Sequence, residues 1–459
     1  MKKESQNIVQ PTELDDDEME KVTGGAMVVN HNMAEINTLT QLSKNQSSLS
    51  KSLEKLSSGM KIDSAADDPS GYQISERMRV QNQALDQANY NVQNGRSMLK
   101  VAEGAVSSTV EILRTLKEKV IDAVNDTNTE VDRDAIQKEI DASIQQIDDN
   151  ALLTFDGKFL NNGARTCKGE AISNVLYNEQ LNEDTKTDTT LTSLKDRCGK
   201  NLEIEATDNI TVSYVQGGKT YTSTFEVNES TTLNDLFFKP IPESETDSDI
   251  VKRTPDDDNA LPFALSEGTN DNGNALFITA DVAGIDGQIS AICIEVKDKN
   301  GNIKADANSI LDSFTEAVSA RNESDDNGVA IQIGPDSKVK NLSLDGMRAS
   351  ALGLSGKGAT VSVADKTAAT ATLKVIDNAL QRALNQEASI GAAMNRLEFT
   401  SNNLTTSSEN LQSAESTYRD ADMAKEMTEF TKNNILMQAA QSMLSQANQQ
   451  NQGVLSLLQ

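Results

Sequence analysis

Apolar residues repeat every seven positions near both ends of this chain, and that repeat constrains its fold more than any other feature. A sustained period of seven places the repeating residues on one face of a helix and is typical of helices that pack along their length. Two such regions in one chain can pair with each other. The three rows are Leu42, Leu49 and Leu56; Leu85, Val92, Leu99, Val106, Leu113 and Val120; and Ile376, Ala383, Ile390, Leu397, Leu404, Leu411 and Tyr418.

The middle of the chain, from about Cys167 to Asp345, has no heptads. Its segment NITVSYVQGGKTYTSTFEV alternates apolar and polar residues around Gly217-Gly218, which predicts a β-hairpin. Polar and turn-forming residues mark loops. The other elements expected here are strands at Phe277–Ala280 and Ile289–Val296, a turn at Asp298–Asn302, a loop at Glu243–Asn274 and a short helix at Ser309–Ala320.

The predicted fold class is therefore mainly α with a β-rich insert (α+β). Both chain ends are expected to form a long antiparallel, coiled-coil-like rod, with a variable β-containing domain at its tip. Helix is expected from near Thr367 to the C-terminus with little interruption. The expected segments are 1–25 as an extension, 26–72 and 73–167 as N-terminal helices, 168–345 as the insert, and 346–418 and 419–459 as C-terminal helices.

Charge and hydropathy exclude several kinds of partner. The net charge is −28, so the field of the chain repels nucleic acid and anionic membranes. No apolar run approaches the roughly 18 to 20 residues that a membrane span needs. The N-terminus lacks the basic and apolar regions of an ordinary secretory signal. We therefore expect no nucleic-acid partner and no membrane insertion.

The residues that common enzymes need are absent from the sequence. The chain has one histidine, His31, which excludes the H-E-x-x-H zinc site, and it has no G-x-S-x-G, Walker or G-x-G-x-x-G motif. The cysteines Cys167, Cys198 and Cys293 lack C-x-x-C spacing, so neither zinc nor thioredoxin-like chemistry is indicated. We expect a structural protein without catalytic residues, cofactor or metal.

The C-terminal segment carries no charged residue after Lys432. Buried unpaired charge is costly, so a segment that is buried against other copies of the chain is expected to lose its charges. The alternative is a polar, disordered tail, but the interleaved apolar residues argue against it. The residues expected on the assembly surface here are Leu436, Ala440, Met443 and Ala447 on one helical face, followed by Leu455 and Leu458, together with Leu42, Leu49 and Leu56 of the N-terminal helix.

Long stretches at both ends resemble the bacterial flagellins. At the N-terminal end, AMVVNHNMAEINT at 26–38 is similar to the mature start of the family, and LEKLSSGMKIDSAADDPSGYQISERMR is similar to its N-terminal signature. At the other end, YRDADMAKEMTEFTKNNILMQAAQSMLSQANQQNQGVLSLLQ resembles the C-terminal signature almost residue for residue. The resemblance covers about 26–160 and 349–459.

This resemblance implies a secreted subunit that polymerises with itself into the filament of the bacterial flagellum and serves motility. In the family the terminal segments, here about 27–68 and 419–459, are disordered in the monomer and fold into paired helices on assembly. The implied partners are an export chaperone, the flagellar export apparatus, the filament cap and the hook-junction proteins. The alternatives are a hook–filament junction protein, which has similar termini, and a flagellin with a glycan-binding insert.

The family also implies a region that an innate-immune receptor contacts, in a helix resembling Q-R-x-R-E-L-A-V-Q. The aligned stretch here is 114–122. Glu118 keeps its place, but Thr115 stands for an arginine and Lys119 for the central leucine. Since losing an arginine and an apolar anchor weakens an interface, we expect poor signalling through that receptor.

Residues 1–25 have no counterpart in the flagellin pattern and resemble a double-glycine leader cut by a transporter's protease between Gly25 and Ala26. Gly24 and Gly25 fit a narrow protease cleft, and Leu14, Met19 and Val22 lie near one helical face upstream of the cut. Two alternatives remain: translation that starts at Met27, and an uncut solvated tail.

Overall fold

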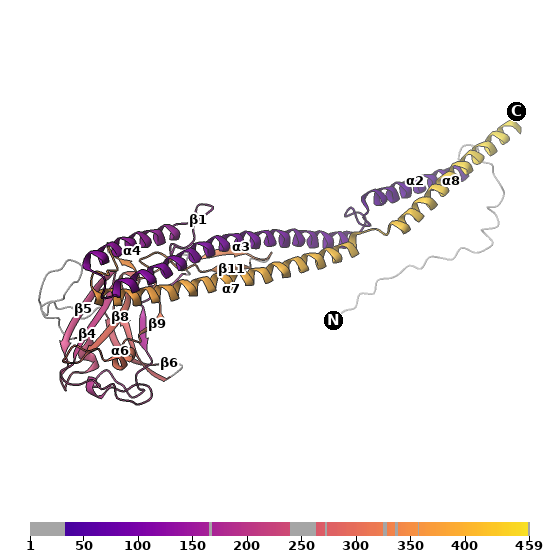
Figure 1. Ribbon diagram of the computed structural model, residues 1–459. Helices are drawn as coiled ribbons and strands as arrows, with labels where there is room; N and C mark the ends of the chain where they lie inside the picture. Colours follow the sequence, from indigo (N-terminus) through magenta and orange to yellow (C-terminus); the bar gives the residue numbers. More distant parts are fainter. Residues whose placement is uncertain are drawn as a thin grey trace, which may run out of the picture. The chain divides into compact units, whose positions relative to one another are not determined.

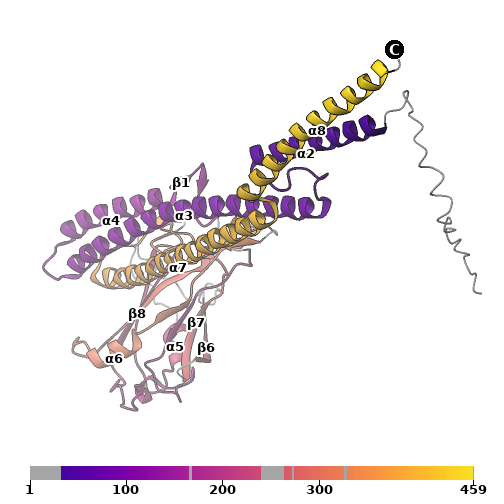
Figure 2. The same cartoon turned by 90° about the vertical axis from the view of Figure 1, so that its right-hand side faces the viewer.

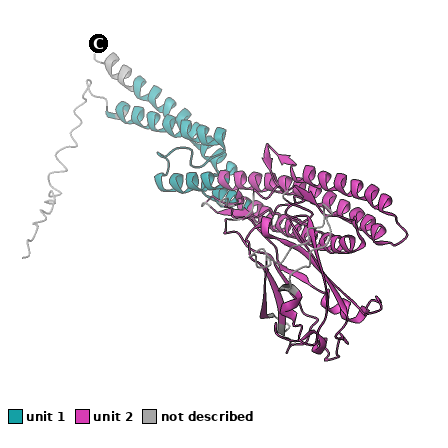
Figure 3. Ribbon diagram, turned by 90° about the vertical axis from the view of Figure 1, so that its left-hand side faces the viewer, with its two compact units in different colours: residues 1–82, 409–459 teal, residues 83–408 magenta. Residues whose placement is uncertain are grey.

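The computed structural model describes residues 33–164, 168–238, 263–270, 273–324, 328–335, 338–356 and 358–457 (Figure 1). The chain divides into two compact units, coloured separately in Figure 3. Unit 1 comprises Met1–Asn82 and Glu409–Gln459, and unit 2 comprises Gln83–Ser408. The mainly α fold with a β-rich middle is confirmed.

Unit 1 is built from two helices that pair with each other and from the ends of two longer helices. The pair consists of α2 (Met33–Ser58) and α8 (Met423–Leu457), which lie side by side in Figures 1 and 2. The longer helices are α3 (Pro69–Val124) and α7 (Lys366–Arg419). Among the described helices, none combines the length and apolar character needed to cross a membrane.

The C-terminal helix is interrupted more definitely than the sequence predicts, because α7 ends at Arg419 and α8 begins at Met423. The new helix has its own N-cap: the Asp422 carboxylate accepts hydrogen bonds from the backbone N–H groups of Ala424 (3.0 Å) and Lys425 (3.2 Å). A capping aspartate satisfies backbone donors that a continuous helix would have paired internally. The sequence Asp-Ala-Asp at 420–422 therefore contains the N-cap residue that marks this helix start.

In unit 2, α3 and α7 run antiparallel and bury the predicted heptad rows. Three polar contacts show the antiparallel direction, because the residue number rises along α3 while it falls along α7. The pairs are Asp86 with Ser408, Arg96 with Glu398 and Lys117 with Asp377. The residues of the α3 row, from Leu85 to Val120, are each at most 7% exposed, so the predicted burial of this row is confirmed. The α7 row is buried from Ile376 to Leu404, whereas Tyr418, in unit 1, is 43% exposed.

A third helix, α4 (Glu130–Ala151), completes the helical part of unit 2. It begins with a capping box, in which the Thr129 hydroxyl accepts from the Asp132 N–H and the Asp132 carboxylate accepts from the Thr129 N–H. Its buried face consists of Ile140, Ile144, Ile147 and Ala151. This spacing of three and four residues is that of an amphipathic helix packed on one side.

Two antiparallel sheets form most of the insert and share one core. The first has the order β6-β7-β3-β9 and the second β5-β4-β8. Apolar residues from both sheets, such as Leu176, Ile278, Ile210 and Ile292, are at most 2% exposed and belong to the same cluster. The strands are β3 (Val175–Asn178), β4 (Asn209–Gln216), β5 (Lys219–Glu226), β6 (Phe263–Asn270), β7 (Gly273–Ala280), β8 (Ile289–Lys297) and β9 (Thr315–Val318).

The predicted hairpin is confirmed as β4–β5, and the predicted later strands as β7 and β8. Gln216 pairs with Lys219, so Gly217 and Gly218 alone form the turn. Their φ values are 58° and 78°. A two-residue turn with both φ positive matches the twist of the strands and favours glycine at both positions. The predicted turn at 298–302 is also present, with the Asp298 N–H donating to the Asn302 carbonyl at 2.8 Å.

Two expectations for the insert are wrong. The expected loop at 243–274 contains β6 and the first residues of β7, and the rest of it, 243–262 and 271–272, lies outside the described residues. The expected helix at 309–320 is instead the end of α6 (Ala305–Leu311) followed by β9. Residues 315–318 form a strand and not a helix because they pair with β3, which provides backbone hydrogen-bond partners that the local sequence does not reveal.

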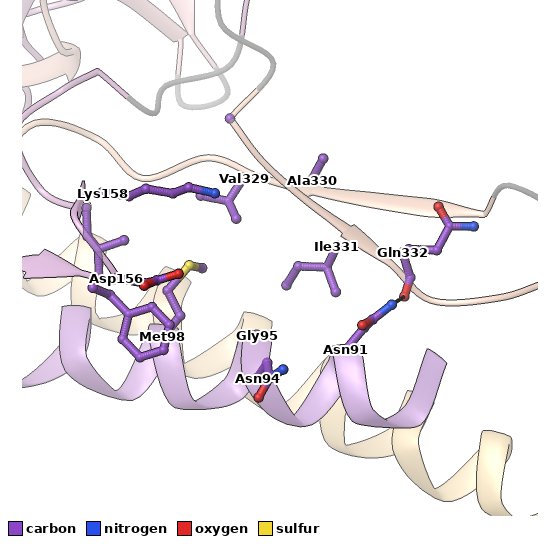
Figure 4. Close-up of a pocket in the computed structure, with 13 residues that line it drawn as sticks. Asn91, Asn94, Gly95, Met98, Asp156, Lys158, Val329, Ala330, Ile331 and Gln332 are labelled. Carbon is purple, nitrogen blue, oxygen red and sulfur yellow. Dashed lines mark hydrogen bonds between the residues drawn. The ribbon is translucent and has the colours of Figure 1, made fainter. Parts of the chain in front are cut away.

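Short elements complete unit 2, and some of them line a cavity on α3. The hairpin β10–β11 places Ile331 above Gly95 of α3 (Figure 4). Together with β1 and β2 these residues enclose about 560 Å³. The short elements are β1 (Thr154–Phe155), β2 (Lys158–Phe159), η2 (Leu191–Ser193), α5 (Leu233–Phe238), η3 (Ile285–Gly287), β10 (Val329–Gln332), β11 (Val339–Leu342), β12 (Ser355–Gly356) and β13 (Ala359–Thr360).

Candidate assembly surface

The helices α2 and α8 pair through a narrow seam with heptad spacing. On α2 the half-buried positions include Leu42, Leu49 and Leu56, the three residues of its heptad row. On α8 the half-buried positions include Met437, Ala440, Leu444 and Ala447. The helices are antiparallel, because Ser52 contacts Asn433 (3.4 Å) while Met60 pairs with Asp420. Alternating steps of three and four residues produce such a seam.

The seam leaves many large apolar side chains of both helices uncovered. Because a helix turns once every 3.6 residues, Leu436 and Met443 flank the α8 seam on one side and Met423 and Met427 flank it on the other. Burying such side chains is worth about 1.5–3 kcal/mol each, so their exposure marks a surface that lacks its partner. We call this set the outer apolar surface: Met33 (64% exposed), Ile36 (47%), Leu39 (56%) and Leu53 (54%) on α2, and Met423 (46%), Met427 (47%), Ile435 (60%), Leu436 (42%) and Met443 (58%) on α8.

The structure separates the α8 residues that the sequence places on one face. Ala440 and Ala447 lie in the seam against α2, whereas Leu436 and Met443 belong to the outer apolar surface. The two groups lie next to each other around α8, but α2 covers only the alanines. Leu455 lies in α8, but its side chain is not among those described, and Leu458 lies outside the described residues.

A backbone junction joins the turn after α2 to the break between α7 and α8. The Lys61 N–H donates to the Arg419 carbonyl (2.6 Å), and the Ala421 N–H donates to the Gly59 carbonyl (2.9 Å). Gly59 has φ 71°, a left-handed conformation that costs glycine little and that ends α2. Asp68 caps the next helix, α3, by accepting from the Ser70 N–H. The two backbone hydrogen bonds therefore join the segment that follows α2 to the segment that precedes α8.

Arg419 fixes this junction with its side chain. The residue is only 7% exposed, and its Nη1 donates to Glu76 Oε1 at 2.6 Å. Its guanidinium carbon lies 5.5 Å from the centre of the Tyr72 ring, and its Nε contacts the Met60 sulfur at 3.2 Å. The hydrogen bond from Arg419 holds the pKa of Glu76 below its ordinary value, and the same bond raises the pKa of Arg419. Sequence reasoning missed this residue, although it stands in the quoted YRDAD motif.

The remaining residues singled out from the sequence lie elsewhere. Thr115 and Glu118 are exposed on α3 in unit 2, and Lys119 forms an ion pair with Glu139 of α4 (2.9 Å). Gly24, Gly25 and Ala26 lie outside the described residues, as does Cys167. Cys198 is exposed, while burial raises the pKa of the Cys293 thiol to about 12. Within the described ranges, no cluster of three His, Cys, Asp or Glu residues could hold a metal ion.

Comparison with known proteins gives family matches over both helical ends and relatives that match most of the chain. The family model of the bacterial flagellin N-terminal helical region matches residues 29–166, and that of the C-terminal helical region matches residues 373–458. A flagellin of Clostridium tyrobutyricum is 33% identical over 93% of this chain and 100% of its own length. A flagellin of Bacillus subtilis (strain 168) is also 33% identical, over 94% of this chain and 100% of its own length.

Solved structures that resemble the chain are more distant. FliC from Burkholderia pseudomallei has a TM-score of 0.25 and 15% identity, covering 66% of this chain and 99% of its own. The flagellar hook associated protein-3 from Legionella pneumophila has a TM-score of 0.32 and 17% identity, covering 74% of this chain and 97% of its own.

Proposed function

We propose, from the premise that this chain belongs to the bacterial flagellin family, that the outer apolar surface of α2 and α8 is where one subunit binds the next. Flagellins are the subunits of the flagellar filament, an extracellular structure, and this chain is such a subunit. The observation that carries the proposal is that α2 and α8 pack against each other through one seam, while nine large apolar side chains among their described residues stay exposed.

The physical argument concerns where those side chains can be buried. The exposed side chains of α2 and α8 cannot be buried against each other, because the sides of the two helices that face each other are already occupied by the seam. Contact between this surface and a different patch of the next copy is heterologous and does not close, so it propagates as a helical polymer. A charge-free stretch after Lys432 suits such a contact, since no charge has to be desolvated when the subunits meet.

Polymerisation of the full-length chain tests the proposal. In the double variant Leu436→Gln/Met443→Gln, glutamine keeps helix propensity but removes apolar area. We expect this variant to form few or no sedimentable filaments, while its circular dichroism and urea unfolding match those of the parent chain. The control is Lys425→Gln, which changes an exposed polar position of the same helix. Normal filament yield from the double variant would sink the proposal.

The role proposed for the chain is structural and not catalytic, and its proposed partners follow from the family. They are an export chaperone, the export apparatus, the filament cap and the hook-junction proteins, in addition to a homopolymer of the chain itself. A hook–filament junction protein is the alternative, but the flagellin-type C-terminal sequence, present here through Gln459, favours the filament subunit. Copy number in purified filaments distinguishes the two, since a junction protein is a minor component.

A second proposal concerns the receptor-aligned stretch on α3. We infer weak signalling through the innate-immune receptor, because Thr115 and Lys119 replace an arginine and a leucine of the family motif. Lys119 is held by Glu139 at a partly exposed position, so replacing it should not disturb the fold greatly. In a reporter-cell assay, Thr115→Arg/Lys119→Leu should raise potency above that of the parent chain. Full potency of the parent would refute the inference.

A third proposal is that residues 1–25 are a leader removed by a transporter's protease after Gly25. The intact mass and first residue of the protein taken from filaments test it. A chain that begins at Ala26 supports cleavage. One that begins at Met27 supports the later translation start, and one that begins at Met1 contradicts both.

A further inference from the structure

We propose that a cavity in unit 2 binds a small molecule that carries a carboxylate, through the side chains of Arg321 and Gln386. The cavity measures about 780 Å³, which is within the usual range for small-molecule sites. One wall is a face of α7, and the others are the loops at 162–164, 319–324 and 345–351. This site lies outside the assembly surface and does not depend on it.

Two buried hydrogen-bond donors in the cavity lining have no acceptor. Gln386 is 5% exposed, and its Nε2 atom is buried and unpaired. The Nε atom of Arg321 is likewise buried and unpaired. Among the described residues that line the cavity, no buried side-chain acceptor is left unpaired. Since leaving buried donors unpaired is costly, the cavity favours a ligand that supplies acceptor oxygens.

The described lining contains three arginines, Arg321, Arg348 and Arg382, and of these Arg321 carries the buried donor that lacks an acceptor. The Arg382 guanidinium is 9% exposed and donates to the Glu316 carboxylate and to the Ala351 carbonyl, so its charge is already neutralised. Glu323 and Asp345 are exposed at the rim, where solvent screens their repulsion of an anion. Arginine bonded to a carboxylate is among the stronger charge-assisted pairs.

The shape of the lining also restricts the ligand. The loops at 162–164 and 345–351 pack so closely that a Cβ added to Gly346 would lie 3.0 Å from the Gly163 Cα. This wall therefore has little room to move. The described lining residues include no aromatic ring, so the site offers no stacking platform for a sugar ring or a base. A compact carboxylate with oxygens that reach both donors fits best.

Titration calorimetry of the full-length monomer with citrate and with acetate tests this inference. We expect saturable binding of at least one of them, absent with sodium chloride at the same ionic strength. Gln386→Met removes one donor, and Arg321→Gln removes the positive charge of the guanidinium, so each variant should weaken binding at least tenfold. The matched controls are Gln93→Met and Arg114→Gln, exposed positions of α3 that should leave binding unchanged.

Binding to assembled filaments identifies the source of the carboxylate. Binding to both monomer and filament supports a free small molecule as the occupant. Binding to the monomer alone supports an acidic side chain of a neighbouring copy that takes the same place in the filament. If neither citrate nor acetate binds the parent monomer, or if folded Gln386→Met and Arg321→Gln bind as tightly as the parent, the proposal is overturned. Because these measurements use the monomer first, a failure of the assembly proposal does not affect them.

Discussion

Arg419 shows how one residue can connect three segments of unit 1. It is the last residue of α7, its backbone carbonyl accepts from the Lys61 N–H, and its guanidinium donates to Glu76 on α3. A buried arginine needs such partners, because an unpaired buried charge is costly. The contact also makes the junction sensitive to pH, since protonating Glu76 removes the charge that Arg419 faces.

Acid should weaken this junction in a predictable direction. The pKa of Glu76 is lowered in the folded chain, so the pair contributes stability above the ordinary glutamate value of 4.5, and this contribution is lost as the pH falls through the folded value. We expect Glu76→Gln to flatten the fall in unfolding midpoint between neutral pH and about pH 3 relative to the parent. Thermal melts at several pH values measure this effect.

The comparison for this prediction is Glu409→Gln, which neutralises an exposed acid of the same unit. It should leave the acid dependence close to that of the parent chain. An unchanged acid dependence in Glu76→Gln would show that the Arg419–Glu76 contact does not contribute to the pH sensitivity of the fold.

At the scale of elements, local periodicity predicted the helices because it records burial directly. Every residue of the row from Leu85 to Val120 is buried, since a straight helix repeats its contacts at a fixed spacing. The strand β6 pairs with its neighbour β7 in a hairpin, but it lies in a stretch whose polar and turn-forming residues favoured a loop. The strand β9 was not predicted because its place depends on pairing with the distant β3. The same holds for the cavity, since Arg321 and Gln386 meet only in the folded chain.

Two glycines of α3 separate the effect of helix propensity from that of packing. Gly104 is exposed, and a Cβ added there meets nothing within 4 Å, so Gly104→Ala should stabilise the chain by about 0.5–1 kcal/mol. At Gly95 the added Cβ would lie 2.3 Å from Ile331 Cδ1 of β10. Figure 4 shows Ile331 facing Gly95. Overpacking costs about 1–3 kcal/mol, so Gly95→Ala should destabilise.

Urea unfolding of both variants provides the measurement. Adding Ile331→Ala to Gly95→Ala tests the cause, because removing the clashing atoms should make the glycine substitution less harmful than it is in the parent background. If Gly95→Ala stabilises the chain as much as Gly104→Ala does, the contact between β10 and α3 is looser than the structure indicates.

At the scale of the whole molecule, assembly brings together strongly acidic chains, since the full sequence carries a net charge of −28. The final segment of the assembly surface is free of charge after Lys432, but the rest of each subunit still repels its neighbours. Such repulsion acts over the Debye length, which shrinks from about 30 Å at 0.01 M salt to about 8 Å at 0.15 M. The apolar contacts of the outer surface do not need counter-charges, so screening should help assembly without weakening what holds the subunits together.

The critical concentration for polymerisation should therefore fall as sodium chloride is raised from about 0.01 M to 0.15 M, and sedimentation of filaments at each salt concentration measures it. Sucrose at matched osmolality is the control, because it changes water activity without screening charge. If salt instead raised the critical concentration, specific ion pairs between subunits would outweigh both the general repulsion and the apolar contacts. The outer apolar surface of α2 and α8 would then not be the main source of binding free energy between neighbours.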